Sequence, residues 1–261
     1  MKQRLVILGA GESGTGSAIL GISKGFDVFV SDKGKIADNY KEELNKWSVP
    51  FEESKHSTEL ILNADLVVKS PGIPDKAELI VALRDKNIPV ISEIEFASRY
   101  TNAYMVAITG TNGKTTTTSL IYHIFKKAGL NVGLGGNIGK SFARQVALEN
   151  FDVYVLEISS FQLDGCYDFR ANIAVLTNIT PDHLDRYDYK LENYIKSKFR
   201  ITQNQKEEDY FIYHFDDEIT TNNLNLIQGK AQILPVSLDH ILESGAFLND
   251  KNIEVHIPQL S

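Results

Sequence analysis

The segment Gly110–Thr116 constrains the fold of this chain more than any other stretch. Its sequence is Gly-Thr-Asn-Gly-Lys-Thr-Thr, and it stands between an apolar run at 104–108 and a helical pattern at 115–128. A glycine-rich turn between a strand and a helix lets backbone N–H groups converge on phosphate oxygens, and the helix dipole favours their charge. The turn is shorter than the strict phosphate-loop pattern, but its Gly-Lys-Thr core is intact. The segment therefore predicts a phosphate site within an α/β fold.

Seven residues form this predicted phosphate loop: Gly110, Thr111, Asn112, Gly113, Lys114, Thr115 and Thr116. Lys114 is expected to pair with the β- and γ-phosphates of a bound nucleotide, and the Thr115 hydroxyl is expected to reach Mg²⁺. A glycine-rich turn that holds no phosphate is the alternative interpretation.

Strand and helix patterns alternate along the chain. Strands are expected at 5–8, 27–30, 66–68, 89–91, 104–108, 153–158, 173–176 and 210–213, and helices at 14–24, 36–47, 76–86, 93–99, 115–128, 141–149 and 191–203. This alternation predicts parallel sheets covered by helices. We expect a Rossmann-like domain at 1–92 and an α/β domain of the P-loop ATPase type at 93–261.

The last stretch differs from this rhythm. Residues 247–257 predict a β-hairpin around 249–252. The chain then stops at Ser261 without a terminal helix, as if it were cut inside the second domain, so we expect that domain to be incomplete.

Composition excludes several classes of protein. Lys plus Arg is 27 and Asp plus Glu is 34, so the net charge is −7, which argues against nucleic acid or a membrane surface as the main partner. The single cysteine, Cys166, forbids an internal disulfide and fits a reducing compartment. No apolar run approaches the ~20 residues of a membrane helix, and no signal peptide is evident. We expect a cytoplasmic monomer.

Polar residues follow two further strands of the second half. Glu157 lies at the end of the strand at 153–158, and the run 178–183, which ends in His183, follows the strand at 173–176. Ligands in open parallel sheets gather at the carboxyl ends of strands. Glu157 is therefore a candidate Mg²⁺ ligand, with a helix-capping carboxylate as the alternative.

The N-terminal part carries a second glycine pattern. Gly9, Gly11 and Gly14 form a G-x-G-x-x-G turn after a strand, and Asp32 closes the next strand. Alone this pattern predicts a nicotinamide dinucleotide site. It is a weak signal, because the same backbone turn can hold any diphosphate.

Together these segments resemble the Mur ligase family, over residues 5–217. The matching segments, in order along the chain, are 70–73, 110–115, 135–139, 156–163, 182–187 and 198–201. Two of them, 159–163 and 182–187, are most similar to the family member that adds D-glutamate. The resemblance implies an ATP-dependent amide ligase of peptidoglycan precursor synthesis, with UDP-N-acetylmuramoyl-L-alanine and D-glutamate as substrates and an acyl phosphate as intermediate.

The resemblance also implies roles for individual residues. Lys114, His183 and Lys198 would be catalytic, and Lys198 would carry a carbamate. Two Mg²⁺ ions would be held by Thr115, Glu157, His183 and Lys198. Substrate would contact Gly11, Ser13, Gly14, Asp32, Ser70, Asn137, Ser159 and Gln162, with the UDP moiety in the first domain. A solvated helix lysine is the alternative interpretation of Lys198.

Some features depart from the family pattern. Lys33 stands where a small polar residue is expected beside Asp32, and Glu12 places a carboxylate in the anion-binding turn. The family's third domain and its adenine-side His-Asn segment have no counterpart here, so we expect a fragment without full turnover. Two other functions stay open: a nicotinamide-dependent oxidoreductase and a non-catalytic nucleotide-binding fragment.

Overall fold

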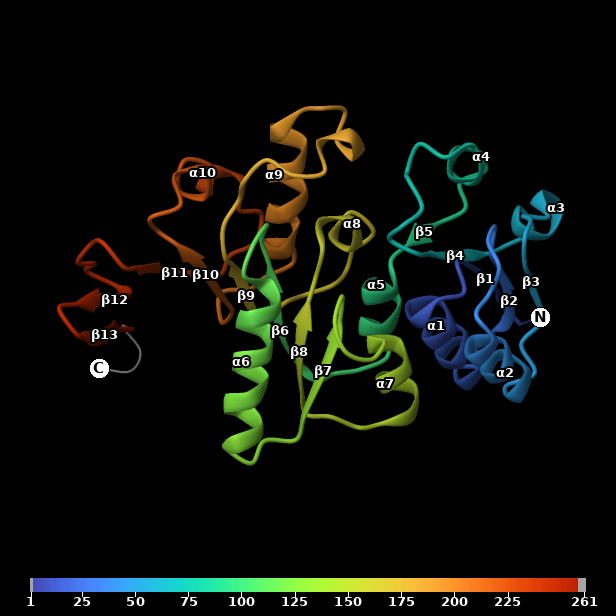
Figure 1. The fold of residues 1–261 in the computed structure, drawn as a ribbon, viewed down its shortest axis with the longest axis horizontal. Helices are drawn as coiled ribbons and strands as arrows, with labels where there is room; N and C mark the ends of the chain where they lie inside the picture. The colour runs from blue at the N-terminus through green and yellow to red at the C-terminus, as the bar shows by residue number, and fades with distance from the viewer. Residues whose placement is uncertain (1, 258–261) are drawn as a thin grey trace. The chain divides into compact units, whose positions relative to one another are not determined.

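The computed structural model describes residues 2–257 and divides them into two compact units (Figure 1). The first unit comprises residues up to 103 with 133–152 and 164–169, and the second comprises 104–132, 153–163 and residues from 170 onward. The domains predicted at 1–92 and 93–261 stay a prediction. The chain end at Ser261 lies outside the described residues.

A five-stranded parallel sheet forms the centre of the first unit. Its strands are β1 (Arg4–Leu8), β2 (Asp27–Ser31), β3 (Phe51–Glu52), β4 (Leu66–Lys69) and β5 (Val90–Ile91), in the order β3-β2-β1-β4-β5. All neighbouring pairs are parallel. The strand order reverses between β1 and β4, and ligands of such sheets bind at the carboxyl ends beside that point.

Six helices of the described residues belong to this unit: α1 (Glu12–Ser23), α2 (Asp38–Lys46), α3 (Thr58–Ile61), α4 (Glu78–Asp85), α5 (Glu93–Ser98) and α7 (Phe142–Leu148). The sheet and its helices bury one apolar cluster, which includes Val6, Val67 and Ile80. α1 packs against both α5 and α7. The helices thus cover short apolar strands, as the alternation predicts.

The second unit is built on strands that flank β6 (Tyr104–Thr109). The others are β8 (Val153–Glu157), β9 (Ile173–Leu176), β10 (Tyr210–His214), β11 (Gln232–Ser237), β12 (Gly245–Asn249) and β13 (Asn252–His256), in the order β13-β12-β11-β10-β9-β6-β8. β6 pairs parallel with β8 and β9, β10 pairs parallel with β9 and β11, β11 pairs parallel with β12, and β12 pairs antiparallel with β13. The boundary between the units falls inside β7 (Val132–Gly136). The predicted α/β class with parallel sheets is confirmed.

Helices α6 (Lys114–Lys127), α8 (Ser160–Leu163), α9 (Leu191–Phe199) and α10 (Glu218–Thr221) belong to the second unit, with 3₁₀ turns at Leu184–Arg186, Arg200–Thr202 and Leu224–Leu226. Ile121 and Phe125 of α6 pack against a buried cluster that includes Val106, Ile108 and Val155. This packing fixes the helix that follows the phosphate loop onto the central strands.

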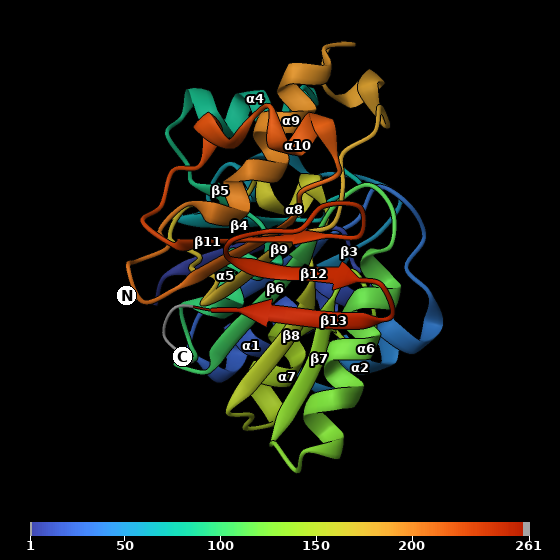
Figure 2. The same cartoon turned by 90° about the vertical axis from the view of Figure 1, so that its left-hand side faces the viewer.

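The predicted hairpin is confirmed as β12 and β13 (Figure 2). Asn249 pairs with Asn252, so Asp250 and Lys251 form the turn, and Asp250 adopts a left-handed φ of 54°. Two-residue hairpin turns of this kind need positive φ, which Asp tolerates better than most residues.

Two elements differ from the sequence-based expectation. The helix expected at 191–203 ends at Phe199 and continues as a 3₁₀ turn. In that turn the Thr202 hydroxyl donates a hydrogen bond to the Phe199 carbonyl (2.7 Å). This side-chain bond competes with the backbone hydrogen bonds that would continue the α-helix. β11 was not expected, and it contains Pro235, a residue that cannot donate to a strand ladder. The structure accommodates Pro235 because the pairing of β11 with β12 begins only at Val236.

No helix within residues 2–257 is long and apolar enough to cross a membrane.

Gly14 generates a test of how α1 begins. A Cβ built on Gly14 would overlap the carbonyl oxygen of Gly9, whereas a Cβ on Gly11 meets no atom within 4 Å. Gly14→Ala should therefore lower the free energy of unfolding by about 1–3 kcal/mol, the usual cost of overpacking. Gly11→Ala is the matched control and should unfold near the wild-type midpoint in urea. Equal midpoints for the two variants would contradict this close approach.

Candidate functional site

The phosphate loop connects β6 to α6 in the structure, as the sequence predicts (Figure 1). Gly113 caps α6 with a left-handed φ of 79°, which glycine adopts without strain. The first bond inside the helix runs from Thr117 N–H to the Gly113 carbonyl (3.0 Å). The N–H groups of Lys114, Thr115 and Thr116 thus stand at a helix N-terminus without intrahelical acceptors, which is the arrangement that binds anions.

The residues after β9 hold the first half of this loop. Asn178 accepts the Thr111 N–H at its backbone carbonyl and the Asn112 N–H at its Oδ1, both at 2.9 Å. The Thr177 hydroxyl donates to the Asn112 carbonyl (2.7 Å). Two of the loop N–H groups are therefore occupied by the protein itself. The donors left for phosphate lie between Gly113 and Thr116.

A carboxylate and a hydroxyl meet at the start of α6. The Thr115 hydroxyl donates to Glu157 Oε2 at 2.7 Å, and Glu157 is 2% exposed at the end of β8. Mg²⁺ is usually bound by one or two oxygen side chains together with substrate phosphates and water. Thr115 and Glu157 fit that donor set. Within residues 2–257 no three His, Cys, Asp or Glu side chains form a cluster that could hold a metal without further ligands.

Two lysines donate to carbonyls of the loop. Lys114 Nζ donates to the Thr111 carbonyl (2.9 Å), and Lys198 Nζ donates to the Gly110 carbonyl (2.7 Å). Lys198 is 1% exposed, and its Nζ lies 4.4 Å from the ring centroid of Tyr194. Lys198 is therefore no solvated surface lysine. Lys198 belongs to α9, so this hydrogen bond links that helix to the phosphate loop.

His183 lies apart from these contacts. It has a left-handed φ of 49°, its side chain is 55% exposed, and its ring centroid is 5.3 Å from that of Phe161. The Arg186 guanidinium also stacks over Phe161, at 4.4 Å. The role of His183 in a second metal site stays a prediction.

Ser159 and Gln162 brace the turn after β8. The Ser159 N–H and hydroxyl both donate to Gln162 Oε1, at 2.9 and 3.1 Å, and Gln162 is 1% exposed. Asn137 belongs to the first unit, in the exposed stretch after β7. Substrate contacts at these three residues stay predictions.

The first unit contains a cavity of about 690 Å³ at the carboxyl ends of its strands. That volume lies in the range of small-molecule sites. Gly9, Asp32 and Ser70 line it, together with Lys33 and His56. The two oxygens of Asp32 accept the N–H groups of Ala10 and Gly34, each at 2.7 Å. The carboxylate that could bind a ribose diol therefore holds the glycine turn in place.

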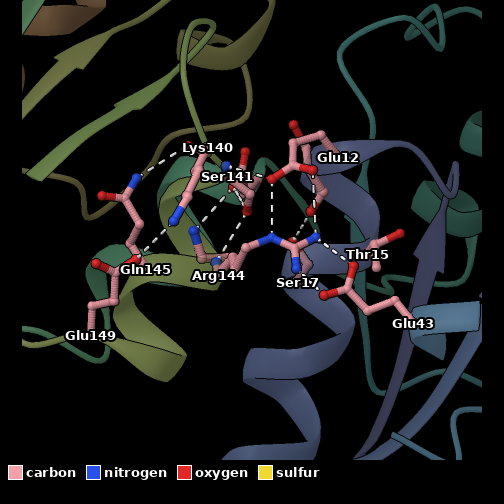
Figure 3. A network of polar contacts seen from close by, with 12 residues as sticks. Glu12, Thr15, Ser17, Glu43, Lys140, Ser141, Arg144, Gln145 and Glu149 are labelled. Atoms are coloured by element: carbon pink, nitrogen blue, oxygen red, sulfur yellow. Dashed lines mark hydrogen bonds and ion pairs between the residues drawn. The ribbon is translucent and has the colours of Figure 1, made fainter. Parts of the chain in front are cut away.

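The Glu12 carboxylate points toward the Arg144 guanidinium (Figure 3). Its Oε1 accepts from Arg144 Nε (3.0 Å) and from the Ser141 N–H (2.9 Å). Arg144 also pairs with Glu43 of α2, at 2.8 Å between Nη2 and Oε2. The positive charge of the Arg144 guanidinium thus compensates the Glu12 carboxylate, which would otherwise repel a bound diphosphate.

Glu93 accepts a hydrogen bond from the Ser141 hydroxyl of this network and is 2% exposed. Burial raises the pKa of Glu93 above its ordinary value, and hydrogen bonds from Ser141, Ala143 and Ser13 act against that rise. Ser13, predicted to line the diphosphate, is thus also a partner of a buried carboxyl group.

Sequence patterns did not indicate Asn178 as a loop brace, nor Arg144 and His56. The signal for Arg144 was indirect: an acidic residue in an anion-binding turn requires a cation nearby.

Two family models match the chain. The model of the Mur ligase middle domain matches residues 108–254, and the model of the MurD N-terminal domain matches residues 4–79. The first match includes the phosphate loop, Glu157 and Lys198.

Curated proteins named UDP-N-acetylmuramoylalanine--D-glutamate ligase are similar to nearly all of the chain. Identity is 56% over 257 residues for the protein of Christiangramia forsetii and 59% over 256 residues for that of Bacteroides fragilis. Both alignments cover 98% of this chain and 58% of the relative. The chain thus spans less than two thirds of the length of these relatives.

Solved structures share the fold. UDP-N-acetylmuramate:L-alanyl-gamma-D-glutamyl-meso-diaminopimelate ligase from Neisseria meningitides has a TM-score of 0.64 at 20% identity, covering 97% of this chain and 86% of its own. UDP-N-acetylmuramate-alanine ligase from Thermotoga maritima has a TM-score of 0.57 at 23% identity, covering 92% and 53%. At these identities the likeness concerns the fold alone.

The Glu12–Arg144 pair generates a test of charge compensation. Arg144→Gln should lower the free energy of unfolding by about 1–3 kcal/mol, because two partly buried carboxylates lose their partner. Adding Glu12→Gln should recover part of that loss, since one of the unpaired charges is then removed. Urea denaturation of the single and double variants measures both effects.

Lys140→Gln is the matched control, because Lys140 lies in the same segment with its side chain 70% exposed. Strict additivity of Arg144→Gln and Glu12→Gln would show that the two side chains are not coupled.

Proposed function

We propose, since the chain belongs to the Mur ligase family, that it is part of an ATP-dependent ligase that joins D-glutamate to UDP-N-acetylmuramoyl-L-alanine. The curated relatives with 56–59% identity carry the name of that activity. One observation carries the proposal: the loop at the end of β6 is joined by hydrogen bonds to both Glu157 and Lys198, through Thr115 and Gly110.

The reaction needs an activated carboxylate, because a carboxylate ion is a poor electrophile. An oxygen of the alanyl carboxylate attacks the γ-phosphorus of ATP, ADP leaves, and an acyl phosphate forms. The amine of D-glutamate then attacks the acyl carbon, inorganic phosphate leaves with the bonding electrons, and the amine loses a proton. ATP hydrolysis is thereby coupled to one amide bond.

The loop residues would position the triphosphate for this transfer. N–H groups from Gly113 to Thr116 would bind phosphate oxygens, and Lys114 would exchange its contact with the Thr111 carbonyl for the β- and γ-phosphates. Thr115 and Glu157 would hold Mg²⁺, which when bound neutralises charge on the transferred phosphoryl group. Catalysis of this kind depends on positioning and electrostatics.

We propose the remaining roles on the strength of the family. His183 would bind a second Mg²⁺ near the muramoyl substrate, and Asn137, Ser159 and Gln162 would contact that substrate. The UDP moiety would occupy the first unit, at residues that line its cavity or form its glycine turn: Gly11, Ser13, Gly14, Asp32 and Ser70. We also propose a cytoplasmic monomer without nucleic-acid or membrane partners.

A narrower role for the chain by itself is a second candidate. The chain covers 58% of the relatives' length, and domain closure often completes an active site of this type. The chain alone would then bind nucleotide without turnover. An oxidoreductase role has less support, because the curated relatives with 56–59% identity carry the name of a ligase.

Lys114→Ala tests the nucleotide site. The chain should bind a non-hydrolysable ATP analogue weakly and only with Mg²⁺, and Lys114→Ala should abolish that binding, because loop N–H groups alone do not offset the triphosphate charge. Isothermal titration calorimetry measures both. Lys127→Ala, at the other end of α6, is the matched control. An unchanged affinity of Lys114→Ala for the ATP analogue would contradict the proposed phosphate site.

The full-length protein tests the reaction itself. It should release ADP and form the D-glutamyl product only when UDP-N-acetylmuramoyl-L-alanine and D-glutamate are both present, and the chain alone should form none. Product formation by the chain alone at roughly 1–10³ s⁻¹, the usual range for enzymes, would refute the narrower role.

Lys198→Ala tests the carbamate. We propose that the Lys198 ammonium loses a proton to solvent and that the neutral amine then adds to carbon dioxide and loses a second proton, which leaves an anionic carbamate as an oxygen ligand for Mg²⁺. In the full-length protein, Lys198→Ala should lose nearly all activity, and short-chain carboxylates should restore part of it by replacing the missing oxygens.

Lys196→Ala is the matched control, because Lys196 lies on the same helix and is exposed. If Lys198→Ala folds stably but no carboxylate restores its activity, the carbamate proposal is wrong and the role of Lys198 is purely structural.

A further inference from the structure

Glu93 is a buried carboxyl group to which the proposed reaction gives no role. It lies at the start of α5 and is 2% exposed. Its Oε1 accepts hydrogen bonds from the Ser141 hydroxyl and from the Ala143 N–H, the latter at 3.1 Å. Its Oε2 is buried and has no hydrogen-bond partner among residues 2–257. A buried carboxyl oxygen left unpaired costs stability, so its position calls for a cause.

Both donors to Oε1 stand at the start of α7, the helix that follows Asn137. We call residues 137–140 the Asn137 loop. Gln145 of α7 joins the two ends of this loop, because its Nε2 donates to the Leu134 carbonyl at 2.7 Å and to the Lys140 carbonyl at 3.2 Å. Whatever fixes the start of α7 therefore also fixes the Asn137 loop.

The start of α7 is also held against α1, the helix that begins at the glycine turn (Figure 3). The Ser141 N–H donates to Glu12 Oε1 at 2.9 Å. Gly16 of α1 approaches so closely that a Cβ built on it would lie 1.9 Å from the Ser141 hydroxyl oxygen. Ser13, in the first turn of α1, acts on the Glu93 carboxyl group and works to lower its pKa. Glu93 thus lies where α1, α5 and α7 meet.

The charges around Glu93 favour its neutral form. Burial raises the pKa of Glu93, and Glu12 on α1 adds to that rise. Arg144 on α7 forms its ion pairs with other carboxylates. Glu95, on the same helix as Glu93, accepts the N–H groups of residues 167–169. A buried carboxylate without a paired cation is costly, whereas the neutral acid avoids that cost and gains a proton to donate.

We propose that Glu93 is a positioning residue that holds the Asn137 loop against the glycine turn, as a neutral acid whose Oε2 proton is directed to Ser13. This inference rests on the proposed function, in which the diphosphate lies at the glycine turn and the muramoyl group at Asn137. A ligand that reaches both elements depends on their spacing, because a misplacement of about 1 Å can cancel the benefit of a contact. A ligand that reaches the glycine turn alone does not.

Calorimetry with UDP-N-acetylmuramoyl-L-alanine and with UDP tests this role on the chain. Glu93→Ala should weaken binding of the longer ligand about tenfold, the effect of one lost hydrogen-bonded contact. Binding of UDP should change by less than about twofold, because UDP does not reach the Asn137 loop. The ratio of the two affinities is the readout, since a partly unfolded variant would lose both ligands equally.

Glu93→Gln is the conservative variant and should retain the wild-type ratio. Its amide oxygen can accept from Ser141 and Ala143, and its N–H₂ group takes the place of the acid proton. Glu42→Ala, an exposed change on α2, is the matched control and should also leave the ratio unchanged.

Gly16→Ala tests the same link without a change at Glu93. The added Cβ would overlap the Ser141 hydroxyl and must displace it from Glu93 Oε1. The variant should therefore lower the ratio of affinities in the same direction as Glu93→Ala.

The pH dependence of stability tests the neutral state. A group whose pKa is higher in the folded chain stabilises the fold at low pH and loses that contribution as pH rises through the folded pKa. From about pH 5 upward, the urea midpoint of the wild type should therefore fall relative to that of Glu93→Gln, whose amide does not titrate.

The outcomes distinguish this inference from the function on which it rests. An unchanged ratio in both Glu93→Ala and Gly16→Ala would overturn the positioning role while the nucleotide-sugar site stands. Urea midpoints of the wild type and Glu93→Gln that run parallel with pH would overturn the neutral state. Absence of UDP-N-acetylmuramoyl-L-alanine binding in the wild type would overturn both the role and the proposed site.

Discussion

The parallel register of β6 with its two neighbours is the constraint on which the phosphate loop depends. Ile108 stands opposite Glu157 on β8, and Thr109 stands opposite Leu176 on β9. The residues that follow these pairs therefore meet at one edge of the sheet. A slip of one residue would turn every side chain to the other face, and Thr115 would lose its partner. The positions of the polar side chains at this edge thus depend on the pairing of strands whose own side chains are buried and apolar.

The same edge of the sheet concentrates positive charge. Lys114 and Lys198 both donate to carbonyls of the loop, and the N-terminus of α6 adds the positive end of its dipole. A buried ammonium is costly unless it is hydrogen-bonded, so the Gly110 carbonyl stabilises Lys198 in its position. Glu157 is the compensating carboxylate, and an anionic substrate with a divalent cation would keep that balance. The arrangement favours a triphosphate over an uncharged ligand.

Local patterns predicted the elements whose cause is local. β6 and α6 follow from an apolar run and a glycine turn, and β12–β13 follows from its turn residues. β11 could not be predicted, because Pro235 is tolerated only through the late start of a neighbouring strand. Partners far apart in sequence were equally hidden: Asn178 braces Asn112, and Arg144 neutralises Glu12, only because helices and strands bring them together. The conflict at Glu12 was visible in the sequence, but the residue that resolves it was not.

The first unit shows why a glycine fingerprint does not identify a ligand. Its turn and the acidic residue after β2 have the spacing of a dinucleotide site, yet Asp32 uses both oxygens to hold Ala10 and Gly34. An acidic residue in that position therefore stabilises the turn, whatever the ligand. Each of those oxygens keeps a second lone pair, so a further hydrogen bond from Asp32 to a ligand stays compatible with this structural role. The fingerprint thus describes how the turn is held, and the choice of ligand depends on the full set of side chains that line the cavity, which includes Asp32, Lys33 and Ser70.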